Sequence, residues 1–240
     1  MFITAAAQTD IGLVRSENED RLLCADDLHL YAVADGIGGL PGGAEAAQTA
    51  ITALLQAARK SANTAQPIDL PAALRAANEA VLDLGATLSP ECGLGTTLCV
   101  ATINGGQLHV ANVGDSRCYL YREHRMLLLT TDDTVENEVL QRRARGERVQ
   151  LEDRYRNALT RCIGQPMPLE VEVRVHPLKA GDQILVCSDG LSRVLDDGQL
   201  ARRLGEDYPP SVVLGALVAD ALAKGGPDNI TGVLIRIDAI

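Results

Sequence analysis

The order of apolar runs along the chain predicts an α+β fold in which helices cover layers of mostly antiparallel strands. Short apolar runs typical of strands occur in groups, and two long Ala- and Leu-rich segments with helical spacing follow one another between those groups. A parallel βαβ series would alternate single strands with single helices, so a layered sandwich is the expected architecture. The 240 residues, 46% of them hydrophobic, are expected to form one domain spanning residues 1–240.

The N-terminal half is predicted to contain strands followed by a pair of helices. Apolar runs between polar breaks predict strands at residues 2–8, 21–25 and 28–34. Helical spacing of Ala and Leu predicts helices at residues 43–60 and 71–88, joined by a short polar connection.

The C-terminal half is predicted to begin with strands that form an antiparallel meander between residues 96 and 130, with turns at Asn104 and near His124. A charged segment, residues 132–156, follows and contains one amphipathic helix. That helix is expected to bury Val135, Val139 and Leu140. The remaining elements are predicted to be strands at 171–177, 183–188 and 230–237 and helices near 196–204 and 210–223.

Composition excludes several classes of function. A net charge of −10, one Phe and no Trp disfavour nucleic acid, because its recognition uses basic surfaces and aromatic stacking. Six cysteines without a CxxC pair indicate reduced core thiols and a cytoplasmic protein. The start of the chain lacks the basic region of a signal peptide, and no uncharged apolar run reaches about 18 residues, so neither export nor membrane insertion is expected. A monomer is expected.

Four aspartates are the main candidates for chemistry. Asp35, Asp115 and Asp189 each end an apolar strand and precede a small residue, whereas Asp228 opens a strand. Any one of them alone is better explained as turn chemistry. Together, at the ends of adjacent strands of a sheet, they would repel one another unless cations neutralised them. The oxygen-rich set predicts magnesium or manganese rather than zinc or copper, and Gly36 would let the backbone approach a metal closely.

A second acidic cluster near the N-terminus includes an arginine. Glu19 and Asp20 follow Arg15 in a segment that also reads as a solvated loop. In the functional interpretation, the carboxylates support the metal site indirectly, and the planar guanidinium of Arg15 matches a phosphate dianion. An anion binder beside metal ligands indicates a phosphoryl substrate.

Seven motifs in order give the chain a resemblance to the bacterial branch of the metal-dependent type 2C Ser/Thr protein phosphatases. They are TDIGLVRSENED, YAVADGIGG, GTT at 95–97, NVGDSRCYL, LTRCIG, CSDGLS and GGPDNITGVLI. The resemblance spans nearly the whole chain. It implies a four-layer α-β-β-α sandwich with two central, mostly antiparallel sheets and a dinuclear manganese or magnesium site at one end.

The resemblance also implies a role for each acidic position. Asp35 would bridge two ions, Gly36 would offer its carbonyl, and Asp189 and Asp228 would complete one metal. Glu19 and Asp20 would act largely through water, and Asp115 would bind a third, weaker ion. The implied metal set is Asp35, Gly36, Asp189, Asp228, Asp115, Glu19 and Asp20.

The implied reaction is attack of a metal-activated water on phosphoserine or phosphothreonine. Arg15 would bind the phosphate, and Arg15, Asp35 and Asp189 form the predicted catalytic set. Relatives commonly carry a histidine after the DGxGG segment, where this chain has Leu40. Water held by the metal is therefore the expected proton donor to the leaving alcohol. Residues 132–156 would form the flap near the centre.

The expected partners are phosphorylated proteins, including a Ser/Thr kinase that the phosphatase opposes and that kinase's targets. Control of type VI secretion is one setting in which such stand-alone members act. Two alternatives stay open: a phosphatase of the stress-response or sporulation branch, and a catalytically silent, cation-dependent binding module. The presence of Arg15 and Asp115 counts against the first, and the presence of Asp35, Asp189 and Asp228 counts against the second.

Overall fold

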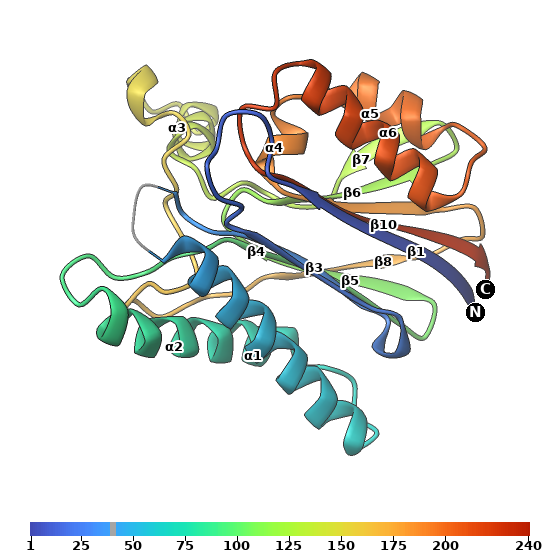
Figure 1. Cartoon of the computed structure of the whole chain (residues 1–240), viewed down its shortest axis with the longest axis horizontal. Coiled ribbons are helices and arrows are strands. Elements are labelled where there is room, and N and C mark those ends of the chain that lie inside the picture. The colour runs from blue at the N-terminus through green and yellow to red at the C-terminus, as the bar shows by residue number, and fades with distance from the viewer. Residues whose placement is uncertain (39–41) are drawn as a thin grey trace.

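Two five-stranded sheets lie face to face between two layers of helices in the computed structural model, which describes residues 1–38 and 42–240 (Figure 1). Within each sheet, neighbouring strands pair antiparallel. Figure 1 shows α1 and α2 on one outer face and α4, α5 and α6 on the other. The predicted α+β class and four-layer sandwich are confirmed.

The first sheet contains both ends of the chain, with strand order β1-β10-β9-β6-β7. Its strands are β1 (Phe2–Asp10), β10 (Ile230–Ala239), β9 (Gln183–Cys187), β6 (Arg117–Arg122) and β7 (Arg125–Leu128). Strand β10 lies between β1 and β9, so the last strand of the chain joins the first strand to the rest of the sheet.

The second sheet has the order β2-β3-β4-β5-β8. Its strands are β2 (Asp20–Ala25), β3 (Leu30–Asp35), β4 (Leu98–Asn104), β5 (Gln107–Val113) and β8 (Val173–Pro177). Side chains alternate between the two faces of a strand. In β3, Tyr31 and Val33 accordingly pack toward the first sheet, while Ala32 and Ala34 pack toward the helices. Burial of both faces explains why this strand reads as a continuous apolar run.

The helices begin and end close to the predicted positions. They are α1 (Gly43–Asn63), α2 (Leu70–Leu88), α3 (Val135–Ala144), α4 (Asp189–Ser192), α5 (Asp197–Leu204) and α6 (Pro210–Ala223), with 3₁₀ turns η1 (Asp26–Leu28) and η2 (Asp153–Tyr155). Asp69 caps α2 by accepting a hydrogen bond from the Ala72 amide at 3.0 Å. In α3, Val139 is buried as expected but Leu140 is exposed, so the prediction for Leu140 is wrong.

Three apolar cores correspond to the three spaces between the four layers. One lies between α1, α2 and the second sheet, one lies between the sheets, and one lies between the first sheet and α4–α6. Within the described residues, no helix combines the length and apolar character needed to cross a membrane.

The predicted meander between residues 96 and 130 is wrong at its centre. Strands β4 and β5 pair as expected, and so do β6 and β7, but the first pair belongs to one sheet and the second pair to the other. The chain crosses between the sheets at Gly114, whose φ of +102° suits glycine. A Cβ there would lie 2.6 Å from the Thr97 side chain, so the crossing also depends on a close contact that a local pattern does not reveal.

Candidate active site

Asp35 is held at the end of β3 by two threonines that precede β4. The Asp35 amide donates to Thr97 Oγ1 at 2.9 Å, and the Thr96 hydroxyl donates to the Asp35 carbonyl at 2.8 Å. Thr97 Oγ1 also hydrogen-bonds to Ser116 Oγ at 2.7 Å, which links this point to the crossing between the sheets. The GTT motif therefore fixes the backbone of the central aspartate.

Gly36 and Gly190 allow backbone segments to approach one another closely beside the acidic residues. A Cβ at Gly36 would lie 2.4 Å from the Gly43 carbonyl oxygen, and one at Gly190 would lie 1.9 Å from the Asn229 carbonyl oxygen. Because these neighbours are backbone atoms, any side chain would push the segments apart. Gly190 thereby keeps the start of α4 against the segment that precedes β10.

Asp20 lies opposite Asp35 in the register of β2 and β3 and is 2% exposed. Its Oδ2 accepts a hydrogen bond from Ser188 Oγ at 2.8 Å. Ser188 follows β9 of the first sheet and immediately precedes Asp189. The acidic residues therefore meet where the ends of both sheets come together. The expectation that adjacent strands of one sheet would gather them is wrong.

A cavity of about 420 Å³ joins these residues at one end of the sandwich. Its lining includes seven of the eight residues in the predicted site, and the eighth, Asp20, is buried opposite Asp35 in the pairing of β2 and β3. The lining members are Arg15, Glu19, Asp35, Gly36, Asp115, Asp189 and Asp228, together with Ile37, Gly38, Thr97, Asn157, Ala158, Leu159, Cys162 and Asn229.

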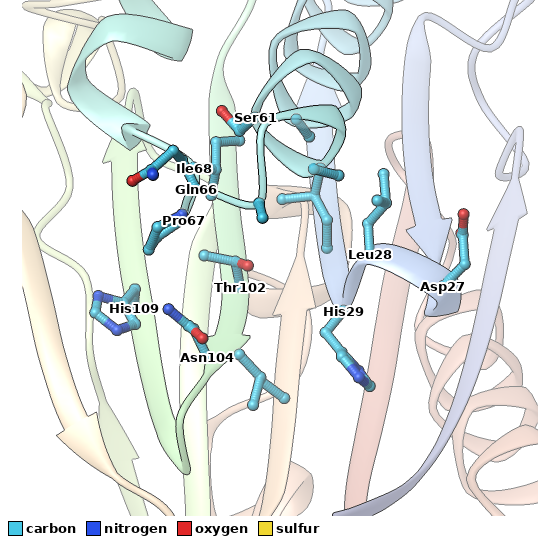
Figure 2. A pocket seen from close by; sticks show the side chains of 15 residues that line it. Asp27, Leu28, His29, Ser61, Gln66, Pro67, Ile68, Thr102, Asn104 and His109 are labelled. Carbon is cyan, nitrogen blue, oxygen red and sulfur yellow. The ribbon is translucent and has the colours of Figure 1, made fainter.

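A different cavity, of about 360 Å³, lies at the opposite ends of β3 and β4. Figure 2 shows Thr102, Asn104 and His109 of the sheet around it, together with Gln66 from the connection between α1 and α2. Asp27 is the one acidic side chain among the described residues that line it, so this cavity lacks the carboxylate set of the first.

Burial and mutual repulsion disfavour ionisation of the clustered carboxyl groups. Burial raises the pKa of Asp20 to about 6, and the neighbouring Asp189 adds to the effect. Burial and Asp20 raise the pKa of Asp35 well above its ordinary value. Burial and Asp189 raise the pKa of Asp115 to about 6, although Arg193 opposes the increase. Negative charge is therefore crowded here beyond what the side chains alone can neutralise.

Two arginines lie among the carboxylates. Arg15 Nη2 donates to Asp228 Oδ2 at 2.8 Å, and both side chains are partly exposed. Arg193 in the turn after α4 contacts Asp115 through Nη2 and Asp189 through Nε, the latter at 3.3 Å. In the described residues, no three Asp, Glu, His or Cys side chains are arranged as a ready-made cation site.

The residues nevertheless fit divalent cations in their chemistry. Asp20 Oδ1 is buried and has no hydrogen-bond partner among the described residues, so it is an oxygen with unused acceptor capacity. The surrounding donors are carboxylate and carbonyl oxygens, which magnesium and manganese prefer. A bound cation would relieve the repulsion that raises the pKa values of Asp20 and Asp35.

Asn229 positions the loop that carries Arg15 and Glu19. Its Nδ2 donates to the carbonyls of Ile11 and Glu17 at 2.9 Å each, and its Oδ1 accepts from the Glu19 amide at 2.8 Å. Sequence reasoning missed this role, although the residue directly follows Asp228 in the GGPDNITGVLI motif. It also missed the roles of Ser188 and Arg193, although both lie in the segment CSDGLSR around Asp189.

The helix predicted within residues 132–156 is present as α3, and the assignment of this segment as a flap stays a prediction. Arg143, Arg145 and Arg148 are exposed, and the half-buried Arg142 pairs with Glu147 at 2.7 Å. The residues that line the cavity are Asn157, Ala158 and Leu159, just beyond the predicted boundary.

Comparison with known proteins decides the family. The model of the family described as protein phosphatase 2C matches residues 15–222. The serine/threonine phosphatase stp of Listeria monocytogenes is 30% identical over 241 aligned residues, covering 98% of this chain and 96% of that protein. The chain belongs to the protein phosphatase 2C family. Membership confirms the predicted enzyme class, a metal-dependent serine/threonine protein phosphatase that hydrolyses phosphate monoesters.

Solved structures of family members share the fold over nearly the whole chain. The catalytic domain of PstP in complex with two manganese ions is 31% identical with a TM-score of 0.82, covering 98% of this chain and 97% of that one. PstP of Mycobacterium tuberculosis is longer, and this chain aligns with 45% of it. PppA, a regulatory component of type VI secretion in Pseudomonas aeruginosa, is 28% identical with a TM-score of 0.80 and 98% coverage of both chains.

Cys187 and Arg193 have the C-x5-R spacing that cysteine-dependent phosphatases use, but their surroundings differ from such a site. Cys187 is fully buried at the end of β9, and burial raises the pKa of its thiol to about 12. Arg193 contacts carboxylates rather than a loop open to phosphate. A cysteine nucleophile is therefore excluded for this protein phosphatase 2C member.

The position of the missing histidine, Leu40, lies outside the described residues. His29 and His109 line the other cavity, and no histidine is among the described residues that line the acidic one.

Proposed function

We propose that the acidic cavity is the catalytic centre of this phosphatase and that it takes manganese or magnesium ions. The observation that carries the proposal is the meeting of carboxylates from both sheets around one cavity, with a buried, unpartnered Asp20 oxygen behind them. The manganese ions of the PstP catalytic domain support the choice of metal.

The ligand set proposed for two ions, with a weaker third, is Asp35, Gly36, Asp189, Asp228, Asp115, Glu19 and Asp20. When bound, the ions would activate water and offset the charge on the phosphoryl oxygens. Asp35 stands at the centre of the set because Thr96 and Thr97 fix its backbone. Asp20 is buried and accepts a hydrogen bond from Ser188, so within this set it is proposed to act on the ions largely through bound water.

Arg15 is proposed to bind the substrate phosphate. Among the described residues, Nη2 is the one atom of its guanidinium that has a hydrogen-bond partner, and the ion pair with Asp228 is partly exposed. Such pairs contribute at most about 1 kcal/mol, so a phosphate dianion can compete for the guanidinium. The arginine lines the cavity from the loop that Asn229 holds in place.

The proposed substrates are phosphoserine and phosphothreonine proteins, including a Ser/Thr kinase and its targets. We further propose that residues 1–240 act as one cytoplasmic, monomeric catalytic domain. Similarity to PppA makes type VI secretion a candidate setting. A phosphatase of the stress-response branch is the competing proposal for the physiological setting.

Hydrolysis of p-nitrophenyl phosphate and of a phosphothreonine peptide tests this function. We expect turnover with MnCl₂ that EDTA abolishes, and a loss of about 10³-fold or more in Asp35→Ala, equivalent to about 4 kcal/mol. Asp27→Ala removes an exposed aspartate from the opposite end of β3 and should retain the wild-type rate. Manganese binding without any turnover would instead support the binding-module alternative.

A further inference from the structure

An apolar cavity of about 460 Å³ adjoins the catalytic one. The end of α2 forms one wall through Leu82 and Ala86, and the segments 90–95 and 162–166 form the others. Ile37 and Cys162 line both cavities, so the two spaces share a wall. None of the described residues that line the apolar cavity carries a charge.

The apolar cavity is built into the fold. Asn78 of α2 is 5% exposed; its Oδ1 accepts hydrogen bonds from the amides of Gly164 and Gln165 at 2.8 and 3.1 Å, and its Nδ2 donates to the Gln165 carbonyl at 3.0 Å. These three bonds fix the wall formed by residues 162–166.

The same wall is connected to the catalytic aspartate. Ile163 and Thr96 exchange backbone hydrogen bonds of 2.8 and 3.1 Å, and the Thr96 hydroxyl donates to the Asp35 carbonyl. The position of the apolar cavity relative to Asp35 is therefore set by short, direct contacts.

The chemistry of the two cavities differs in a way that fits a peptide substrate. The acidic cavity suits a phosphorylated side chain once cations are bound, whereas the apolar cavity offers no partner for a charged group and gains from burying a hydrocarbon side chain. An extended peptide advances about 3.3 Å per residue, so neighbouring cavities are reached by residues only a few positions apart.

We propose that the apolar cavity is a substrate subsite that accepts a large apolar side chain, such as leucine or methionine, within three residues of the phosphorylated Ser or Thr. This inference rests on the proposed catalytic function. It adds a sequence preference to that function: phosphoproteins with an apolar residue near the phosphate are the better substrates.

A leucine scan tests the subsite. Phosphothreonine peptides with Ala at the three positions on each side receive a single Leu at each position in turn, and kcat/KM is measured with MnCl₂. We expect one or two adjacent positions at which Leu raises kcat/KM by about 10-fold over Ala, and no gain with Lys or Glu there. p-Nitrophenyl phosphate, which has no flanking residues, reports the catalytic centre alone.

Substitution of the exposed wall residue Ala86 provides the structural control. Ala86→Phe fills the cavity and should abolish the preference for Leu. The Leu peptide and the Ala peptide should then have about the same kcat/KM. Thr87→Phe adds the same side chain to the next exposed helix position, outside the cavity, and should keep the wild-type ratio. Ala86→Arg should shift the preference at the same peptide position from Leu toward Glu.

The outcomes separate the two proposals. If the wild-type protein hydrolyses neither p-nitrophenyl phosphate nor any peptide, the proposed function fails and the subsite fails with it. If it hydrolyses all peptides at equal rates, or if Ala86→Phe and Thr87→Phe give the same ratio, the function stands and the subsite is overturned.

Discussion

Asp20 provides the sharpest test of the electrostatics of the site, because it is buried and lies among other carboxylates. Burial raises the pKa of Asp20 from 3.8 to about 6. A carboxyl group whose pKa is higher in the folded than in the unfolded state stabilises the fold below about pH 4, and that contribution is lost as the pH rises through about 6. At pH 7.5, ionised Asp20 therefore costs the cation-free protein stability.

The cost follows from the size of the shift. Since one pKa unit corresponds to about 1.4 kcal/mol, the change from 3.8 to about 6 is equivalent to about 3 kcal/mol at full ionisation. Asp20→Asn removes the charge and keeps an oxygen that can accept the hydrogen bond from Ser188. We expect the substitution to raise the free energy of unfolding of the cation-free protein by about 1–3 kcal/mol at pH 7.5, with the gain disappearing near pH 4.

Urea unfolding in EDTA measures this gain, and manganese should reverse its sign. Ligand binding stabilises a folded protein by about 2.7 kcal/mol at 100 times its Kd, so wild type should gain more from saturating MnCl₂ than Asp20→Asn does. Asp27→Asn, exposed at the other end of the sandwich, should change stability by less than about 0.5 kcal/mol. Destabilisation of the cation-free protein by Asp20→Asn at pH 7.5 would refute the reasoning.

Three further substitutions test the groups around the carboxylates. Arg15→Ala should raise KM for phosphopeptides by about 10-fold. Manganese affinity, measured by calorimetry, should not fall, because Arg15 forms an ion pair with Asp228 and does not hold the Asp228 carboxylate in position for a metal. An equal loss of metal affinity would contradict the assignment of Arg15 to phosphate binding. Arg193→Ala should increase the number or affinity of bound manganese ions, since it removes the cation that contacts Asp115 and Asp189; weaker manganese binding would show that Arg193 positions the ligands instead. Asn229→Ala removes three hydrogen bonds to the Arg15 loop and should lower kcat/KM by about 10-fold or more and the free energy of unfolding by about 2 kcal/mol; wild-type values for both would exclude the positioning role.

The elements of the fold could be predicted because their signals are local. Helical spacing predicted the ends of α1 and α2 to within three residues, and strand-like runs predicted β3, β4 and β9. The crossing between sheets at Gly114 could not be predicted in this way, since a continuous meander and a split pair of hairpins have the same local pattern. The pairing of β5 with β8 and of β6 with β9, between residues far apart in the sequence, distinguishes them.

The candidate site shows the same division between local and distant information. Asp35, Asp189 and Asp228 could be predicted from the sequence because each lies at the boundary of a strand. The family resemblance then indicated that they belong to one metal site. Asn229 gave no such signal, because its function is visible only in hydrogen bonds to residues more than 200 positions away. Arg193 follows Asp189 by one helical turn, but its contact with Asp115 depends on the packing of the two sheets.

The packing of the two sheets is therefore the main determinant of the site's geometry. Asp35 belongs to the second sheet and Asp189 follows a strand of the first, so the separation of their carboxylates depends on the side chains between the sheets. That layer consists of residues such as Val33, Val110 and Val186. Protein interiors are packed closely, so a change in the volume of one side chain is transmitted to its neighbours. A change in volume there would move one group of proposed ligands relative to the other, whereas a change beneath α6 would act on the side of Asp189 and Asp228 alone, because Leu191 and Ile230 belong to that core. Cation affinity in this phosphatase should accordingly be more sensitive to the inter-sheet core than to the core under the outer helices.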